Sequence, residues 1–168
     1  MTLAFALFAL LAAAPAVEWR PEDPANREVV EVTGPSLRGA LAAIGAAEVP
    51  AAKPRPDMIL AQFPDGSRMI LNLKPCGGDG PACQKLLLVS VFEVPPGLGP
   101  EPLKEARLSY LARSSFVSLS LPEGRAPMMM RSVVSDFGIQ RGNLYMELVS
   151  FAKHVQQFRQ ELNAAAKP

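Results

Sequence analysis

One long apolar stripe near the C-terminus constrains the fold more than any other feature of the sequence. Its members recur at alternating steps of four and three positions, which is the spacing of one face of an α-helix. The stripe consists of Leu144, Leu148, Phe151, Val155, Phe158 and Leu162. We therefore predict a helix that begins near Asn143, a residue suited to the N-cap position, and that buries this stripe.

Five apolar segments in the middle of the chain predict strands. Four of them form two hairpins, at residues 57–73 and 116–134, and each hairpin has a turn signal with Pro and Gly at its centre. The fifth, residues 85–92, is apolar on both faces. That pattern is typical of a central strand that is covered on both sides.

Two further segments predict helices. Residues 34–45 place Pro35 at the first helical position and Gly45 just past the helix end, and residues 103–114 follow a break rich in Pro and Gly. The order α-β-β-β-α-β-β-α predicts an α+β domain, with a twisted, mainly antiparallel sheet of about five strands and helices packed against it. We assign this single domain to residues 32–165 and treat residues 17–31 as an extended lead-in.

Residues 1–16 have the composition of a secretory signal peptide. This uncharged apolar run is shorter than the ~20 residues that a membrane span needs, and Ala14-Pro15-Ala16 offers a small-x-small cleavage site. No Lys or Arg precedes the run, so an uncleaved anchor is the alternative. We predict cleavage, no membrane span in the mature chain, and a periplasmic or secreted location in a bacterium.

Both cysteines, Cys76 and Cys83, lie in a loop rich in Gly and Pro between the second and third predicted strands. A structural zinc site needs four ligands, and the chain offers only these two thiols and one distant histidine. A thioredoxin-like couple needs C-x-x-C spacing at the start of a helix. In an exported protein, the remaining interpretation is a disulfide bond that closes the hairpin loop.

The sequence predicts no catalytic, cofactor or metal site. We expect His154, the one histidine, on the solvated side of the last helix, without a nucleophile or an orienting carboxylate in reach. Met128-Met129-Met130 contains the thioether ligands that Cu(I) favours, but strand alternation leaves only two of them on one face, so we predict core packing. No phosphate-binding glycine motif occurs. We therefore predict a protein that is not an enzyme.

The order of elements and several residues resemble the YbjN-like family, whose members are often labelled bacterial sensory transduction regulators. The resemblance covers about residues 30–162. The features in matching places are Cys76, Cys83, the strand at 85–92, Gly138 and the helix from Asn143. Two positions depart from the family pattern: Ala106-Arg107 replaces a Trp-Asn pair in the second helix, and Phe137-Gly138 replaces a paired glycine.

This resemblance implies a fold similar to the class I type III secretion chaperones, with helices on one side of a twisted antiparallel sheet. Proteins of that shape bind extended segments of other proteins, frequently form homodimers and have no catalytic site. The resemblance therefore implies a protein client or regulator as the partner. It also gives the apolar stripe two hypotheses, burial against the chain's own sheet or a homodimer formed partly through the stripe or a sheet edge.

We expect an exported, non-enzymatic protein-binding domain, acting as a periplasmic chaperone or an envelope regulator. The alternative is a periplasmic small-molecule or metal-sensing module, with the Met-rich hairpin as its site. Nucleic acid is not an expected partner, because the formal net charge is +1 and no dense Lys/Arg cluster occurs. A broad apolar surface patch would favour protein binding, whereas an enclosed pocket with converging polar groups would favour a ligand.

Overall fold

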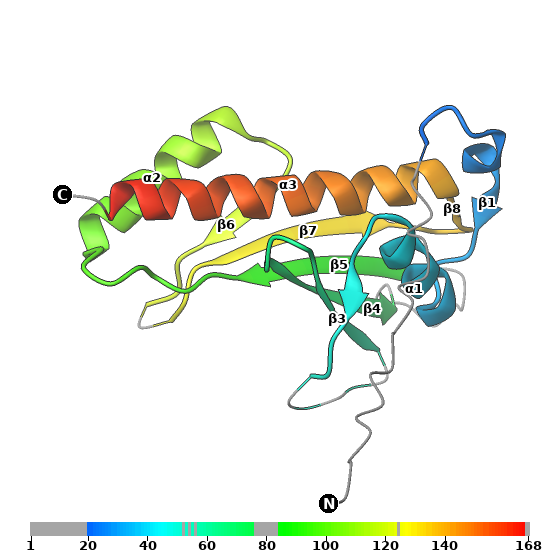
Figure 1. Ribbon diagram of the computed structural model, residues 1–168, viewed down its shortest axis with the longest axis horizontal. Helices are drawn as coiled ribbons and strands as arrows, with labels where there is room; N and C mark the ends of the chain where they lie inside the picture. The colour runs from blue at the N-terminus through cyan, green and yellow to red at the C-terminus, as the bar shows by residue number, and fades with distance from the viewer. Residues whose placement is uncertain are drawn as a thin grey trace, which may run out of the picture.

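The structure, a computed structural model, describes residues 20–51, 53, 55, 57–75, 84–123 and 125–166. Within these residues the fold is α+β, with three α-helices, a six-stranded antiparallel sheet and a two-stranded sheet (Figure 1). The predicted fold class and the order of the main elements are confirmed.

The strands of the large sheet follow the order β2-β3-β4-β5-β7-β6, and all neighbours are antiparallel. Their bounds are β2 Ala47–Glu48, β3 Met58–Gln62, β4 Arg68–Pro75, β5 Gln84–Val91, β6 Ser118–Ser120 and β7 Met128–Val134. The small sheet pairs β1 Val29–Val30 with β8 Ile139–Gln140. The sequence does not predict β1, β2 and β8, because two residues are too few to show strand periodicity.

The lead-in before the first α-helix is more structured than predicted. It contains a short 3₁₀ helix, η1 Pro24–Arg27, before β1. The first α-helix, α1 Gly34–Ala43, has a capping box in which the Thr33 hydroxyl accepts from the Ser36 backbone N–H at 3.3 Å and the Ser36 hydroxyl accepts from the Thr33 N–H at 2.9 Å.

The other two helices are α2 Pro100–Arg113 and α3 Arg141–Ala165. The prediction that Asn143 caps α3 is wrong, because the helix begins at Arg141 with Gln140 as its N-cap residue. The Arg141 backbone N–H donates to the Glu28 carbonyl at 2.8 Å, and the two side chains form an ion pair. Contact with the lead-in, rather than a local side-chain cap, therefore fixes the start of α3.

All three helices pack on one face of the large sheet, and α3 runs along β5 and β7 (Figure 1). The six residues of the predicted stripe are all buried, each at most 1% exposed, in the core between α3 and the sheet. Burial within the chain is therefore the arrangement observed. A partner would reach these side chains only if α3 left the sheet.

The opposite face of the sheet has no such cover, so the prediction that β5 is covered on both sides is wrong for the described part of the chain. Leu86 and Leu88 are fully buried under the helices, whereas Leu87 and Val89 are only partly buried and Val91 is 55% exposed. The apolar pattern shows that both faces of β5 avoid water, but it does not show which element covers them.

Two predictions concern residues outside the described ranges: the signal peptide at 1–16 and the disulfide bond between Cys76 and Cys83. The strands on either side of the cysteine loop are paired neighbours, with Pro75 opposite Gln84. Among the described helices, none is both long enough and apolar enough to cross a bilayer.

Candidate functional site

The side of the large sheet that no described helix covers carries a broad apolar surface, which we call the open face. Its apolar residues are Met58, Leu60, Ile70, Leu87, Val89, Val91, Met128, Met130 and Val134. The strand register places Leu60, Ile70, Val89 and Met130 in one row across four neighbouring strands. Directly opposite side chains lie about 5 Å apart, so this row forms a continuous apolar strip.

The two ends of the open face are more accessible than its centre. Val91 is 55% exposed and Val134 is 63% exposed, while the residues of the central row shield one another. Scattered apolar side chains are ordinary on a protein surface, but a contiguous patch across several strands is typical of an interaction site.

Basic side chains lie at both ends of the open face. Arg68 stands at the start of β4, and Lys74 stands near its end, directly opposite Lys85 of β5. The Lys74 ammonium lies 3.6 Å from the Asp57 carboxylate, which also contacts Arg55 at 3.4 Å. The open face therefore has an apolar centre, with Arg68 at one end and Lys74 and Lys85 at the other.

One buried polar atom on this face has no hydrogen-bond partner. The Oδ1 atom of Asn72, in the row between Met58 and Leu87, is the only such side-chain atom among the described residues. A buried acceptor without a donor costs folding free energy, so Asn72 is a position where stability has not been maximised.

The edges of the large sheet offer little room for an added strand. The edge strands β2 and β6 have two and three residues, and short edges are a common protection against strand pairing. On β6 the Leu119 carbonyl already accepts from Arg107 Nε at 2.9 Å. Arg107, in the place of the family's Trp-Asn pair, thus helps to protect this edge.

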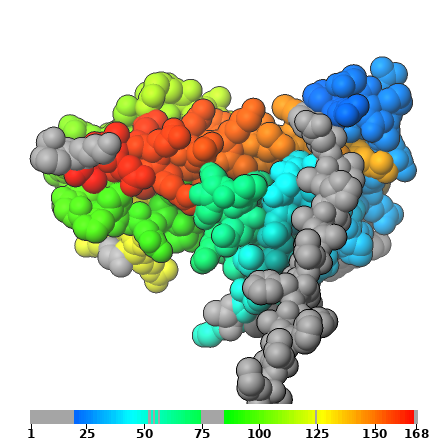
Figure 2. Space-filling model, in the orientation of Figure 1, coloured from blue at the N-terminus to red at the C-terminus, as the bar shows by residue number. Residues whose placement is uncertain are grey.

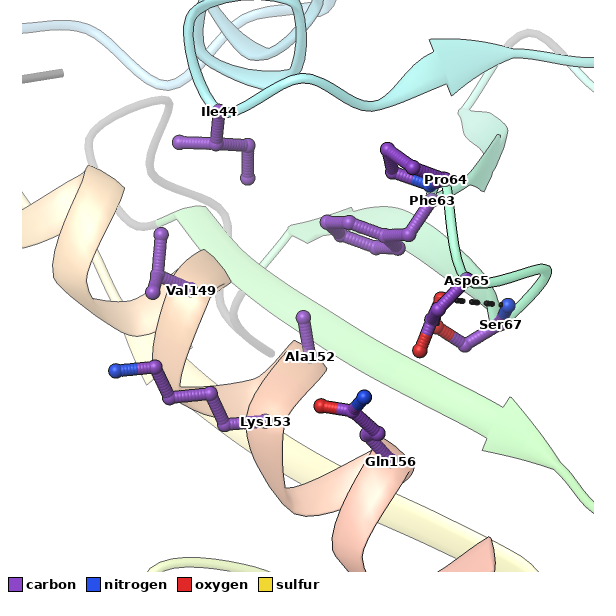
Figure 3. Close-up of a pocket in the computed structure, with 9 residues that line it drawn as sticks. All are labelled: Ile44, Phe63, Pro64, Asp65, Ser67, Val149, Ala152, Lys153 and Gln156. Carbon is purple, nitrogen blue, oxygen red and sulfur yellow. Dashed lines mark hydrogen bonds between the residues drawn. The ribbon is translucent and has the colours of Figure 1, made fainter. Parts of the chain in front are cut away.

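A hollow of about 260 Å³ lies on the other side of the molecule, between α3 and the β3–β4 turn. Figure 2 shows the outer side of α3 crossing the molecule with the β3–β4 segment packed against it. The Phe63 ring points into the hollow between Ile44 and Ala152 (Figure 3). Its remaining lining residues are Pro64, Asp65, Ser67, Val149, Lys153 and Gln156.

Two of the four polar side chains at this hollow, Asp65 and Ser67, are hydrogen-bonded to each other. The Asp65 carboxylate accepts from the Ser67 backbone N–H at 2.9 Å and also from the Ser67 hydroxyl (Figure 3). Burial alone would raise the pKa of Asp65, but the hydrogen bonds from Ser67 and the nearby Arg159 outweigh it and lower the pKa. These contacts fit a side chain that fixes the turn, and they leave few polar groups aimed at a ligand.

The expectation that His154 is solvated is wrong. His154 is half-buried, and its Nδ1 lies 2.5 Å from the Tyr110 hydroxyl of α2 and 3.4 Å from the Ser114 hydroxyl. Burial, with a contribution from Glu161, raises the pKa of Tyr110 to about 12, and burial lowers the pKa of His154. At neutral pH the phenol and the imidazole are therefore both neutral, and they share a short hydrogen bond.

A column of stacked groups continues from His154 toward the sheet. The Phe116 ring stacks on the imidazole with centroids 5.0 Å apart, and the Arg131 guanidinium lies 4.3 Å from the Phe116 centroid. Arg131 also pairs with Glu147 through two hydrogen bonds of 3.0 and 3.1 Å. Every polar member has a partner within the column, which fits a structural role in joining α2 and α3 to β7.

The Met-rich hairpin is divided between the two faces of the sheet. Met129 is fully buried in the core, while Met128 and Met130 lie partly buried on the open face. Among the described residues, no group of three or more His, Cys, Asp or Glu side chains is placed to hold a metal ion.

No protein-family model matches this chain, and no curated protein matches its sequence. Two solved structures are similar to it. The crystal structure of YbjN from E. coli, a candidate transcription regulator, is 14% identical with a TM-score of 0.49, over 82% of this chain and 95% of that chain. An uncharacterized protein from Methanothermobacter thermautotrophicus is 18% identical with a TM-score of 0.44, over 77% and 93%.

The structural match to YbjN extends over most of this chain. At 14% identity, this match describes a similarity of fold only. The resemblance also implied helices on one side of the sheet, which is the arrangement observed.

Proposed function

We propose that this chain is a non-catalytic domain that binds another protein through the open face of its sheet. The observation that carries the proposal is the apolar row of Leu60, Ile70, Val89 and Met130, which no described helix covers. Burying such a surface is favourable by about 25 cal/mol per Å² of apolar area. A protein partner is the occupant that best matches a wide, shallow apolar surface.

The open face is a better binding site than the edges of the large sheet, where an extended segment would have to add as a further strand. Strand addition needs a row of accessible backbone groups, and β2 and β6 supply only short ones. We therefore place the protein partner on the face of the sheet and not at its edge.

The location of this activity is a further part of the proposal. The apolar run at residues 1–16, with its small-x-small cleavage site, supports export. We therefore place the domain in the bacterial envelope, as a chaperone or a regulator.

Site-specific photocrosslinking in the cell tests the binding surface. A photoreactive amino acid is placed at Val91 or Val134 of the open face, and at Leu108 of α2 as a control of similar exposure, 52%. We expect a discrete adduct from the two open-face positions and none from position 108. Adducts of equal yield from all three positions, or none from positions 91 and 134, would contradict the proposal.

The second candidate function is small-molecule sensing through the hollow of Figure 3, which is favoured by its apolar lining of Ile44, Phe63 and Val149. Two of its four polar side chains, Asp65 and Ser67, are bound to each other, which makes it the weaker candidate. A thermal-shift screen compares the chain with an Ala152→Trp variant that fills the hollow. A stabilising compound that loses its effect in the variant would establish ligand binding there.

A further inference from the structure

Phe137 combines two features that are each unfavourable for the chain alone. Its side chain is 86% exposed, the highest value among the large apolar residues that the structure describes. Its φ is 62°, in the left-handed region that favours glycine. Strained backbone positions of this kind are found preferentially at functional contacts. The ring is therefore a candidate for burial against another molecule.

The turn that carries Phe137 is fixed on both sides, so the ring projects from a defined position. The Gly138 backbone N–H donates to the Ser135 carbonyl at 3.0 Å, and the following strand, β8, pairs with β1. Gly138 lies so close to β1 that an added Cβ would be 2.7 Å from the Val29 Cγ1 atom. Val29 is itself 62% exposed. Phe137 and Val29 thus form an apolar projection, which we call the knob.

The hollow of Figure 3 has the size and the lining to accept such a ring. Its volume is about 260 Å³, and an apolar cavity of about 150 Å³ is enough to hold benzene. The Phe63 ring points into the hollow between Ile44 and Ala152, and two aromatic rings pack favourably edge to face or offset. All three of these side chains are only partly buried, so a ring from outside can reach them.

The charged residues beside the knob and the hollow have opposite signs. Asp136, which precedes Phe137, is exposed. Lys153 is exposed at the hollow and forms no ion pair within the described part of the chain. The acidic residue of the hollow, Asp65, has Arg159 beside it, with the guanidinium 3.4 Å from the Asp65 carbonyl. The charge of Lys153 is therefore available to an acidic group that enters with the knob.

The knob cannot fill the hollow of its own chain. It is held at the start of α3, whereas the hollow lies beside the middle of that helix (Figure 1). Arg141 and Ala152 are eleven positions apart, which is about 16 Å along an α-helix. We therefore propose that the knob of one copy of this chain inserts into the hollow of a second copy.

The proposed contact joins two different surfaces, so it is head-to-tail. Each added copy leaves one knob and one hollow unoccupied, and such contacts continue into a ring or a filament. The contact does not use the apolar row of the open face, so it is independent of the function proposed above. A contact built on one ring is small, and small interfaces are weak. We expect assembly at protein concentrations of about 0.1–1 mM.

Sedimentation velocity of two variants and of their mixture tests the proposal. Phe137→Gly removes the knob and keeps the hollow, whereas Ala152→Trp fills the hollow and keeps the knob. The parent chain should form species larger than a dimer as its concentration rises, and each variant alone should stay a monomer. An equimolar mixture of the two variants should form a dimer and nothing larger, because only one knob and one hollow remain in the pair.

The controls separate the contact from general effects on folding and surface polarity. Phe137→Gly relieves the strained φ, so a loss of assembly in this variant does not reflect misfolding, and circular dichroism checks the fold of Ala152→Trp. Leu108→Ala removes an apolar side chain of α2 that is 52% exposed and should leave assembly unchanged. Lys153→Glu should weaken assembly about threefold at low salt.

Three results would each overturn the proposal. The parent chain could remain a monomer at about 1 mM, well within the range in which a weak contact is populated. Phe137→Gly could assemble to the same extent as the parent chain. The mixture of the two variants could contain only monomers.

Discussion

The hydroxyl oxygen of Tyr110 lies 2.5 Å from Nδ1 of His154, although the two residues are 44 positions apart in the chain. The same hydroxyl is 3.1 Å from the His154 carbonyl. Tyr110 is almost fully buried, and its ring also contacts Phe158 of the α3 stripe edge to face, with centroids 5.3 Å apart. One side chain of α2 thus joins the polar and apolar sides of α3.

Removal of this hydroxyl should destabilise the protein. In Tyr110→Phe the ring still packs on Phe158, but Nδ1 and the carbonyl of His154 lose their hydrogen-bond partner, so we expect the free energy of unfolding to fall by about 1–2 kcal/mol. Urea denaturation measures the change. Ser114→Ala, which keeps the Tyr110–His154 hydrogen bond and removes the weaker contacts of the Ser114 hydroxyl with these two residues, is the control and should change stability by less than about 0.5 kcal/mol. Equal effects of the two variants would contradict the assignment.

Stability should decrease in mild acid because of His154. Burial lowers the pKa of His154 below its ordinary value of 6.5, so the unfolded chain binds a proton at a higher pH than the folded chain. The stabilisation is therefore complete above about pH 6.5 and is lost as the pH falls toward the folded pKa. Melting temperatures between pH 5 and 7.5 should show this decrease, and His154→Gln should reduce it. The charged groups that face His154, Glu161 and Arg113, are present in both the parent chain and the His154→Gln variant, so the comparison isolates the effect of His154.

Replacement of Asn72 by Leu should stabilise the domain. The change removes the buried Oδ1 acceptor that lacks a partner and adds apolar area to the open face, so we expect a gain of about 1 kcal/mol in the free energy of unfolding. Chemical denaturation is the measurement. A loss of stability would mean that Asn72 makes a favourable polar contact in solution.

Phe137 should be replaceable by Gly with a gain in stability. Its φ is 62°, a left-handed conformation that Gly adopts far more readily, and its side chain is 86% exposed. Phe137→Gly should raise the free energy of unfolding by about 0.5–1 kcal/mol. Gly138→Ala is the opposite case, because an added Cβ would lie 2.7 Å from the Val29 Cγ1 atom at a φ of 96°. That variant should lose stability, and a loss in Phe137→Gly would contradict the argument.

The proposed disulfide should contribute measurably to stability. Closing a loop of about eight residues between Cys76 and Cys83 is worth about 2.5 kcal/mol in the chain-entropy model. A Cys76→Ser/Cys83→Ser double variant should lose about that amount. Reductant should lower the stability of the parent chain and leave the variant unchanged, and identical denaturation midpoints would rule the bond out.

Local patterns determined much of the fold. The stripe on α3, the two hairpins around turns with Pro and Gly, and the short helix α1, with Pro35 in its first turn and Gly45 after its end, are all properties of neighbouring residues, and the structure contains each of these elements. Such features can be predicted because helix and strand periodicity depend on the nearest turns of the same element. The start of α3 could not be predicted from neighbouring residues, because Glu28, which contacts Arg141 there, lies 113 residues earlier in the chain.

The sequence by itself determined which side chains avoid water, and only the tertiary structure decided what covers them. The apolar residues on both faces of β5 predict burial on both sides, yet α3 covers Leu86 and Leu88 while Leu87 and Val89 face outward. Likewise, nothing near His154 in the chain indicates Tyr110 or Phe116 as its neighbours. Hydrophobic burial is non-directional, so it fixes the composition of a surface, while the packing of whole helices on one side of the sheet decides which surface stays open.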